Sequence, residues 1–144
     1  MSDFLLRDPA RIAELVRSAR RIAVLGIKTD QQANQPAYYV PAYLKRAGLE
    51  VIPVPVYYPE VTTILGAPVY RKVADVPGEI DIVDVFRRSG DIAAHLADLL
   101  TKKPRAVWLQ TGIRDDITAA ALADAGIYVV QDRCLMVDHQ RFTA

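Results

Sequence analysis

The sequence predicts a three-layer α/β fold, in which helices cover both faces of a five-stranded, mainly parallel sheet. Two observations predict it. Five segments of the 144-residue chain are rich in β-branched residues and nearly continuous in apolar character, as parallel strands buried on both faces tend to be. Helical patterns alternate with these segments. Such alternation gives a parallel sheet, because each right-handed crossover needs a helix that packs back on the sheet.

The chain begins with a helix, a strand and a second helix. Residues 8–19 place Pro9 in a first helical turn, where proline is favoured, and repeat apolar residues at helical spacing. Residues 21–26, RIAVLG, form the first expected strand. The second expected helix covers residues 36–47 and is followed by Gly48, a residue type common just beyond a helix end.

The second expected strand, residues 50–54, leads into the longest irregular connection of the chain. Residues 55–78 contain four prolines and two glycines, which disfavour a regular strand or helix. We expect either a functional loop here or an additional hairpin around residues 67–70.

The C-terminal half repeats the alternation of strands and helices. Trp108 lies between two apolar residues in the middle of a strand and is expected in the core or an interface. Residues 135–142 are expected to form a short helix or an irregular tail. The other expected elements are strands at residues 80–86, 105–110 and 127–130, and helices at residues 91–100 and 115–125.

Composition narrows the function classes that are open. The formal net charge is +1 at pH 7 and no run of five or six like charges occurs, which disfavours binding to nucleic acid or to a membrane surface. Cys134 is the only cysteine, so an intramolecular disulfide is excluded and a reducing compartment is favoured. The N-terminus lacks a signal-peptide pattern, and no apolar stretch approaches the ~20 residues that span a bilayer. We expect one domain over residues 1–144 and a cytoplasmic location.

The connection after the first strand is the first candidate ligand site. Ligands of open parallel sheets bind at the carboxyl ends of the strands, and backbone amides at a helix N-terminus attract phosphate. Lys28, Thr29, Asn34 and Gln35 add side-chain donors to this connection. The alternative is that Gly26 only permits a tight strand exit and that the polar side chains are solvated. Both interpretations remain open from the sequence.

A nicotinamide cofactor is disfavoured. The dinucleotide fingerprint G-x-G-x-x-G is absent, because Lys28 stands where the second glycine belongs. The acid expected at the end of the second strand is also absent, since residues 52–55 read IPVP. An NAD(P)-binding reductase is therefore the least favoured function.

Five segments, taken in order, carry a resemblance to a known family. The segments are residues 22–26 with their polar loop, residues 51–54, VDVFRR at 83–88, AVWLQTG at 106–112 and VQDRCLMVDH at 130–139. They resemble the small coenzyme A-binding domain family, which is related to the nucleotide-binding domain of the succinyl-CoA synthetase α subunit. The resemblance covers nearly the whole chain, from about Arg11 to Phe142.

The resemblance implies a Rossmann-like fold that holds coenzyme A across the carboxyl edge of the sheet. The pyrophosphate would lie on the loop at 26–34, the adenosine end near 53–57, and the pantetheine arm toward 86–88 and 110–112. The residues expected to contact coenzyme A are Gly26, Ile27, Lys28, Thr29, Asn34, Gln35, Pro53, Val54, Pro55, Tyr57, Phe86, Arg87, Arg88, Gln110, Gly112 and Cys134.

The chain departs from the family after the second strand. Relatives commonly read Pro-Val-Asn-Pro, whereas this chain reads Pro53-Val54-Pro55-Val56 and lacks the asparagine side chain near the expected adenosine site. Tyr57 and Tyr58 are candidates to stack on the base instead, and the alternative is that they only pack within the loop.

Cys134 is the candidate for reactive chemistry. It follows the fifth strand, so it is expected near the carboxyl edge, where the pantetheine thiol would arrive. One hypothesis is a reversible mixed disulfide between Cys134 and coenzyme A, with Arg133 favouring the thiolate. The alternative is that Cys134 is a small buried apolar residue.

The histidines and carboxylates give no clear catalytic or metal site. His139 follows Asp138 and is a candidate general base, but a structural hydrogen bond is favoured, and His95 is expected on the surface. Neither zinc nor calcium ligand spacing occurs. Asp81 and Asp84 point to opposite faces of a strand, and the acids at 115 and 116 suit a first helical turn.

These observations favour a stand-alone binding or regulatory module for coenzyme A or an acyl-CoA, without evident catalysis of its own. The alternative is an acyl-CoA ligase-like component that acts with a partner subunit. The resemblance implies such a partner, because ligases of the related class use a phosphorylated histidine and a grasp-type nucleotide domain, which 144 residues do not accommodate. A homo-oligomer is also open.

Overall fold

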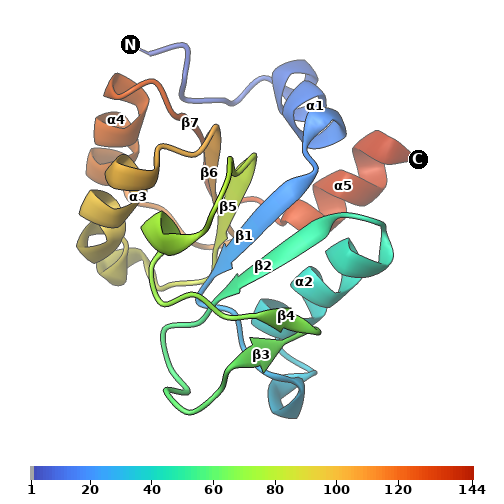
Figure 1. Ribbon diagram of the computed structural model, residues 1–144. Coiled ribbons are helices and arrows are strands. Elements are labelled where there is room, and N and C mark those ends of the chain that lie inside the picture. The colour runs from blue at the N-terminus through green and yellow to red at the C-terminus, as the bar shows by residue number, and fades with distance from the viewer. Residues whose placement is uncertain (1) are drawn as a thin grey trace.

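A single parallel sheet forms the centre of the computed structural model, which describes residues 2–144. The spatial order of its strands is β2-β1-β5-β6-β7, and every neighbouring pair is parallel (Figure 1). The expected five-stranded sheet is therefore confirmed. The strands are β1 (Arg21–Leu25), β2 (Glu50–Val54), β5 (Ile82–Val85), β6 (Ala106–Leu109) and β7 (Tyr128–Val130).

Helices cover both faces of the sheet, as expected for a Rossmann-like fold (Figure 1). One face carries α1 (Pro9–Ser18), α2 (Pro36–Arg46) and α5 (Leu135–Thr143), whose apolar side chains share one buried cluster. The other face carries α3 (Leu96–Lys102) and α4 (Asp116–Asp124), which contribute to a second cluster. Across residues 2–144, none of the helices combines the length and the apolar character needed to cross a membrane.

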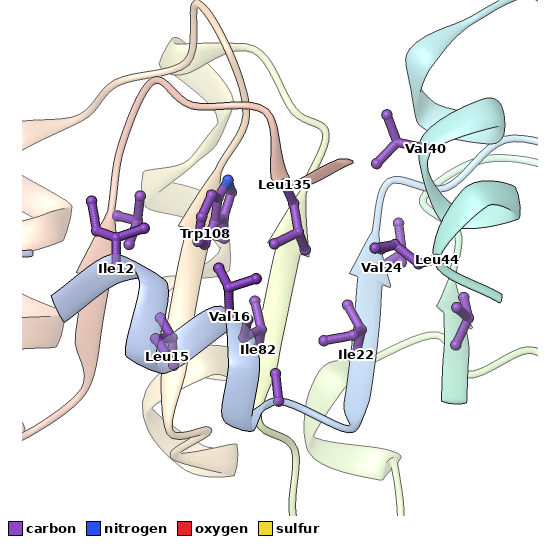
Figure 2. Close-up of a cluster of buried hydrophobic side chains, with 14 of the residues drawn as sticks. Ile12, Leu15, Val16, Ile22, Val24, Val40, Leu44, Ile82, Trp108 and Leu135 are labelled. Carbon is purple, nitrogen blue, oxygen red and sulfur yellow. The ribbon is translucent and has the colours of Figure 1, made fainter. Parts of the chain in front are cut away.

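Successive strand residues supply the two clusters alternately. Ile82 packs into the cluster under α1, α2 and α5, whereas Val83 and Val85 pack into the cluster under α3 and α4. Trp108 is fully buried in the first cluster, beside Leu135 of α5 (Figure 2). The core position expected for Trp108 is thus confirmed, and burial on both faces explains why the strands read as continuous apolar runs.

Two aspartates begin helices as N-cap residues. The Asp8 carboxylate accepts a hydrogen bond of 3.0 Å from the amide of Ala10, with Pro9 as the first residue of α1. The Asp115 carboxylate accepts a bond of 3.0 Å from the amide of Thr118 at the start of α4. These contacts confirm the helix-start role expected for the acids near residue 115.

Tight turns replace the N-terminal half of the helix expected at residues 91–100, and α3 forms its C-terminal half. Two 3₁₀ turns, Ser89–Asp91 and Ala93–His95, precede α3. Their bonds join residues three apart, from Asp91 N to Arg88 O (2.8 Å) and from His95 N to Ile92 O (2.9 Å). The expected element was therefore too long at its N-terminal end, because apolar spacing does not distinguish a 3₁₀ turn from the first turn of an α-helix.

The proline-rich connection contains the additional hairpin that was one of the two expectations for it. Its strands are β3 (Thr63–Ile64) and β4 (Ala67–Pro68), slightly earlier than residues 67–70. The Arg71 guanidinium holds the loop before the hairpin by donating to the carbonyls of residues 57, 58 and 61, at 3.0, 2.8 and 2.8 Å.

At the C-terminal end of the chain, the segment for which a helix or a tail was expected is the helix α5.

Candidate functional site

The strand order places a switch point between β1 and β5. The chain passes from β1 to β2 on one side and later returns to β5 on the other, so the connections diverge at the carboxyl ends of β1 and β5. A cavity of about 570 Å³ lies at this edge. Its walls come from the connections after β1, β5 and β6, and from the start of α5.

Half of the residues expected to contact a ligand line this cavity. They are Lys28, Gln35, Phe86, Arg87, Arg88, Gln110, Gly112 and Cys134. Val40, Ile113 and Tyr39, the last on the exposed side of α2, also line the cavity and were not predicted from the sequence. Val40 is a buried residue of α2, and the fold places this helix against the cavity.

Gly26 closes the switch point and does not line the cavity. Its φ is +87°, and a Cβ on this residue would overlap the main-chain carbonyl of Phe86. Its amide donates to the carbonyl of Val54 at 2.9 Å, while the Phe86 amide donates to Leu25 at the same distance. Gly26 therefore lets the ends of β2, β1 and β5 approach one another, as the tight-exit interpretation proposed.

The amides of Lys28 and Thr29, after Gly26, are engaged within the protein. The Lys28 amide donates to the carbonyl of Ala37 at 3.1 Å, and the Thr29 amide donates to the side chain of Gln32 at 3.1 Å. Ile27 buries its side chain, and Asn34 is exposed away from the cavity wall. This loop thus offers the cavity the side chains of Lys28 and Gln35.

Lys28 and Gln35 form a pair at the start of α2. The Lys28 ammonium donates a hydrogen bond to the side-chain oxygen of Gln35, and both residues line the cavity. Pro36 and Ala37, the first residues of α2, lie in the same wall. A cation and the positive end of a helix dipole therefore face one part of the cavity, an arrangement that attracts anions.

Arg87 is held in place by its neighbours. Its Nε donates to His95 Nε2 at 3.2 Å, and its guanidinium lies 5.6 Å from the ring centre of Tyr57, with Nη1 at 3.4 Å from the Tyr57 hydroxyl. The next residue, Arg88, has an 86% exposed side chain and pairs with Asp91 at 3.1 Å. Two arginines with different freedom of movement thus border the cavity after β5.

His95 is partly buried, so its expected surface position was wrong. The 3₁₀ turns before α3 bring it against Arg87, where the imidazole accepts a hydrogen bond. Burial, and to a smaller extent the positive charge of Arg87, lowers the pKa of His95 below its ordinary value. His95 therefore positions Arg87 as a neutral acceptor.

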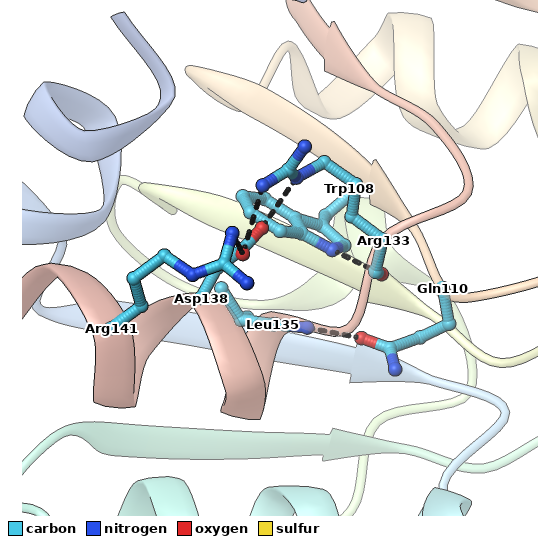
Figure 3. Close-up of polar contacts among 6 residues, drawn as sticks. All are labelled: Trp108, Gln110, Arg133, Leu135, Asp138 and Arg141. Atoms are coloured by element: carbon cyan, nitrogen blue, oxygen red, sulfur yellow. Dashed lines mark hydrogen bonds and ion pairs between the residues drawn. The ribbon is translucent and has the colours of Figure 1, made fainter. Parts of the chain in front are cut away.

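Hydrogen bonds join the end of β6 to the segment after β7 (Figure 3). The Gln110 side-chain oxygen accepts from the Leu135 amide at 3.0 Å, and the Trp108 indole donates to the Arg133 carbonyl at 2.8 Å. The Gly112 amide donates to the Asp132 carboxylate at 2.6 Å. The segments WLQTG and QDRC are thus joined to each other by hydrogen bonds, which fix the start of α5 at the cavity.

Arg133 and Asp138 form a two-bond ion pair behind this contact (Figure 3). The guanidinium donates to the carboxylate at 2.6 and 3.0 Å, and Asp138 is 3% exposed. The hydrogen bond to Asp138 raises the pKa of Arg133 above its ordinary value. Because the guanidinium is engaged with Asp138, Arg133 is not a free cation beside Cys134, which lines the cavity as the last residue before α5.

His139 has the structural role that was favoured for it. Its Nδ1 lies 2.8 Å from the Tyr43 hydroxyl, which joins α5 to α2. Burial lowers the pKa of His139. The residue lies outside the cavity wall, so it is not placed to act on a ligand there.

The remaining expected contacts lie at the end of β2. Pro53, Val54 and Pro55 are buried, and the cavity wall does not include them. Tyr57 is 58% exposed and covers Arg87 from outside. A second cavity of about 500 Å³, which the sequence did not predict, lies across the β1–α2 connection and is lined in part by Thr29, Tyr38, Tyr58, Asp30 and Glu60.

One buried carboxylate stands apart from these contacts. Asp84 in the middle of β5 is fully buried, and neither carboxylate oxygen has a hydrogen-bond partner among residues 2–144. Burial raises its pKa well above the ordinary value. Asp81, just before β5, instead accepts bonds of 2.8 Å from the amides of Arg20 and Arg21. In the described part of the chain, histidines, cysteine and acids do not gather into a group of three that could hold a metal ion.

Comparison with known proteins gives relatives across the chain. Residues 20–140 match the family model described as CoA binding domain. The uncharacterized protein YneT of Bacillus subtilis is 30% identical over 130 residues, which cover 90% of this chain and 93% of YneT. The structure of cell-free ID.343 from Thermus thermophilus has a TM-score of 0.85 and 38% identity, and the match covers 94% of this chain and 99% of that one.

A more distant likeness is limited to the fold. The dinucleotide-forming acetyl-coenzyme A synthetase 1 of Ca. Korarchaeum cryptofilum has a TM-score of 0.61 and 17% identity. The match covers 81% of this chain but only 27% of that one. The same Rossmann-like arrangement thus occurs as one part of a larger protein.

Proposed function

This chain belongs to the CoA-binding domain family, and from that membership we propose that it binds coenzyme A or an acyl-CoA in the cavity at the carboxyl edge of its sheet. The observation that carries the proposal is the composition of that cavity, which combines cations, apolar side chains and a buried amide at the switch point.

The phosphates of coenzyme A have suitable partners on the β1 and β5 side of the cavity. Lys28 supplies an ammonium group, and Arg88 supplies an exposed guanidinium that can turn toward a ligand. Arg87 is already oriented by His95 and Tyr57, so less conformational freedom is lost when it binds an anion. The start of α2 adds the positive end of a helix dipole.

The pantetheine arm suits the opposite part of the cavity. Phe86, Val40 and Ile113 give it an apolar wall for methylene groups. Gln110 uses its side-chain oxygen on Leu135, which leaves the side-chain NH₂ for a carbonyl of the pantetheine amides. With the phosphates and the pantetheine arm placed in this way, the coenzyme A thiol lies near Cys134. The adenosine end then lies on the β2 side, near Tyr57 or in the second cavity.

A binding or regulatory role suits the site better than catalysis by this chain alone. Each histidine is engaged in a hydrogen bond, His95 with Arg87 and His139 with Tyr43. We propose that any acyl transfer would need a partner enzyme subunit, in line with the fold occurring as one part of a larger synthetase. A single domain over residues 1–144, a cytoplasmic location and a homo-oligomer are also part of this proposal.

Isothermal titration of the reduced protein with coenzyme A, acetyl-CoA, NAD and ATP tests the proposal. We expect coenzyme A to bind in the micromolar range, corresponding to about −8 kcal/mol, and NAD and ATP to bind more weakly. Binding of NAD or ATP without binding of coenzyme A would overturn it.

A matched pair of arginine variants locates the site. Arg88→Gln removes an exposed cation of the cavity wall, and we expect it to weaken coenzyme A binding by about tenfold or more, because charge-assisted hydrogen bonds are worth about 1.5–3 kcal/mol. Arg46→Gln removes an exposed arginine from the last turn of α2, outside the cavity wall, and should leave affinity unchanged. Equal losses in the two variants would argue against this cavity.

A further inference from the structure

The wall of the cavity runs along four strand ends, and chemically different groups occupy its two sides. Lys28 follows β1 and Arg87 follows β5, whereas Gln110 follows β6 and Cys134 follows β7. The strands are neighbours in that order, so β1 and β7 are three steps apart, or about 14 Å at ~4.8 Å per step. Cations thus lie on one side of the cavity and the single thiol on the other.

Cys134 is reachable from this cavity. It is partly exposed, lines the wall, and is the last residue before α5, where its side chain makes no capping hydrogen bond. The contacts of Gln110 with Leu135 and of Trp108 with Arg133 hold the main chain on either side of Cys134. The main chain at Cys134 is therefore held at the cavity, while its partly exposed side chain also packs against the buried cluster under α1, α2 and α5.

Gln110 provides independent evidence for a ligand group beside this thiol. The side chain is 4% exposed, and its Nε2 has no hydrogen-bond partner within the described chain, while its oxygen is engaged by the Leu135 amide. Since Gln110 lines the cavity, the NH₂ group faces the same space as Cys134. This nitrogen is not one of the fully buried polar atoms that lack a partner, so it is open to the cavity and can donate to a carbonyl of a ligand there.

We propose that Cys134 is a modification site that accepts coenzyme A from coenzyme A disulfide, which makes the cavity responsive to the redox state of the coenzyme A pool. The inference rests on the proposed function, because the cations would hold the phosphates and Gln110 a pantetheine carbonyl, with a sulfur of the ligand then directed to Cys134. Coenzyme A disulfide carries these same groups on each half.

The step is a thiol–disulfide exchange. The Cys134 thiolate attacks one sulfur of coenzyme A disulfide, the bond between the two coenzyme A sulfurs breaks, and a bond between Cys134 and that sulfur forms. The other coenzyme A leaves as a thiolate and takes up the proton that Cys134 lost. The disulfide is the oxidant, and a reducing thiol reverses the exchange by the same route.

Intact-mass measurement after incubation with coenzyme A disulfide tests the inference. We expect one adduct per chain that dithiothreitol removes, and none on Cys134→Ser. Because binding positions the reacting sulfur, the adduct should form about tenfold or more faster than with glutathione disulfide at equal concentration. Arg88→Gln should slow the reaction with coenzyme A disulfide but not the reaction with glutathione disulfide.

The outcomes separate this inference from the proposed function. If reduced coenzyme A binds in titration but coenzyme A disulfide leaves no adduct, Cys134 is not an acceptor and the proposed binding still holds. Equal rates with the two disulfides would overturn directed modification and leave only a generally reactive thiol. If reduced coenzyme A does not bind and no adduct forms, both proposals are wrong.

Discussion

The side-chain oxygen of Gln110 lies 3.0 Å from the main-chain nitrogen of Leu135 and accepts its hydrogen bond. Gln110, the residue after β6, thereby caps the first amide of α5, and the NH₂ group of its side chain faces the cavity. The contact makes the cavity wall and the position of Cys134 depend on the same side chain. Stability and ligand binding are therefore expected to be coupled at this residue.

Replacement of Gln110 by leucine should destabilise the fold. The substitution keeps the side-chain volume similar but leaves the buried Leu135 amide without a partner, a loss of about 1–3 kcal/mol. Urea denaturation measures it. The exposed Gln31→Leu is the control, and it should change the free energy of unfolding by less than about 0.5 kcal/mol. Equal effects of the two variants would show that the cap contributes nothing.

The ion pair behind the cap gives a second prediction. Arg133→Ala leaves the Asp138 carboxylate buried without its two-bond partner, and because the Arg133 side chain is 28% exposed, the loss should be somewhat below the about 3–5 kcal/mol of a fully buried pair. Arg141→Ala removes the other arginine near the Asp138 carboxylate. The Arg141 side chain is 60% exposed and its nitrogen lies 3.8 Å from the carboxylate, so its loss should cost less than about 1 kcal/mol. Thermal or urea unfolding compares the two. A larger loss for Arg141→Ala would contradict this assignment.

The fold was predictable from the sequence because its signals are local. Buried parallel strands read as apolar runs, and helix starts at Pro9 and Asp115 have their own chemistry. The 3₁₀ turns before α3 were not predictable, since their apolar residues have spacing that also fits a helix. His95 was misplaced for that reason.

Most of the cavity-lining residues that were expected from the sequence follow strand ends, with Gln35 just before α2 as an exception. Phe86, Gln110 and Cys134 each come just after a strand, so the parallel topology alone brings them to one edge. Val40 and Ile113 lie in the wall because of how α2 and the segment after β6 pack, which no short pattern encodes. The unpartnered Asp84 likewise depends on what the completed fold places around a strand residue.

Gly26 provides a third prediction, with a glycine of similar backbone as control. Gly26→Ala and Gly126→Ala both place a Cβ at positive φ, +87° and +82°, which costs about 1–2 kcal/mol in each. Only at Gly26 does the Cβ also meet the Phe86 carbonyl, whereas nothing lies within 4 Å at Gly126. We expect Gly26→Ala to lose a further amount of about 1–3 kcal/mol, measured by urea unfolding. Matching losses would mean that the ends of β1 and β5 can move apart freely.

Asp84→Asn should change the way stability depends on pH. Burial raises the folded-state pKa of Asp84 well above its ordinary value of 3.8, so the folded chain keeps a proton that the unfolded chain releases. The contribution of Asp84 to the free energy of unfolding of the wild type is greatest below pH 3.8. It falls as the pH rises toward the folded-state pKa, by up to about 1.4 kcal/mol per pH unit. Asparagine has no proton to lose, so the variant avoids this fall.

Urea unfolding of wild type and Asp84→Asn at about pH 4.5, 6 and 7.5, a range of roughly three units that lies above the ordinary pKa of Asp84, measures the difference in their free energies of unfolding. The free energy of unfolding of Asp84→Asn relative to wild type should increase steadily with pH, whatever its value at pH 4.5. Asp81→Asn is the comparison, since it replaces a carboxylate that, unlike Asp84, accepts two amide hydrogen bonds. A difference between Asp84→Asn and wild type that stays constant with pH would mean that Asp84 is ionised in the folded chain. An ionised carboxylate there would require a partner for its charge, which the core around β5 does not contain among residues 2–144.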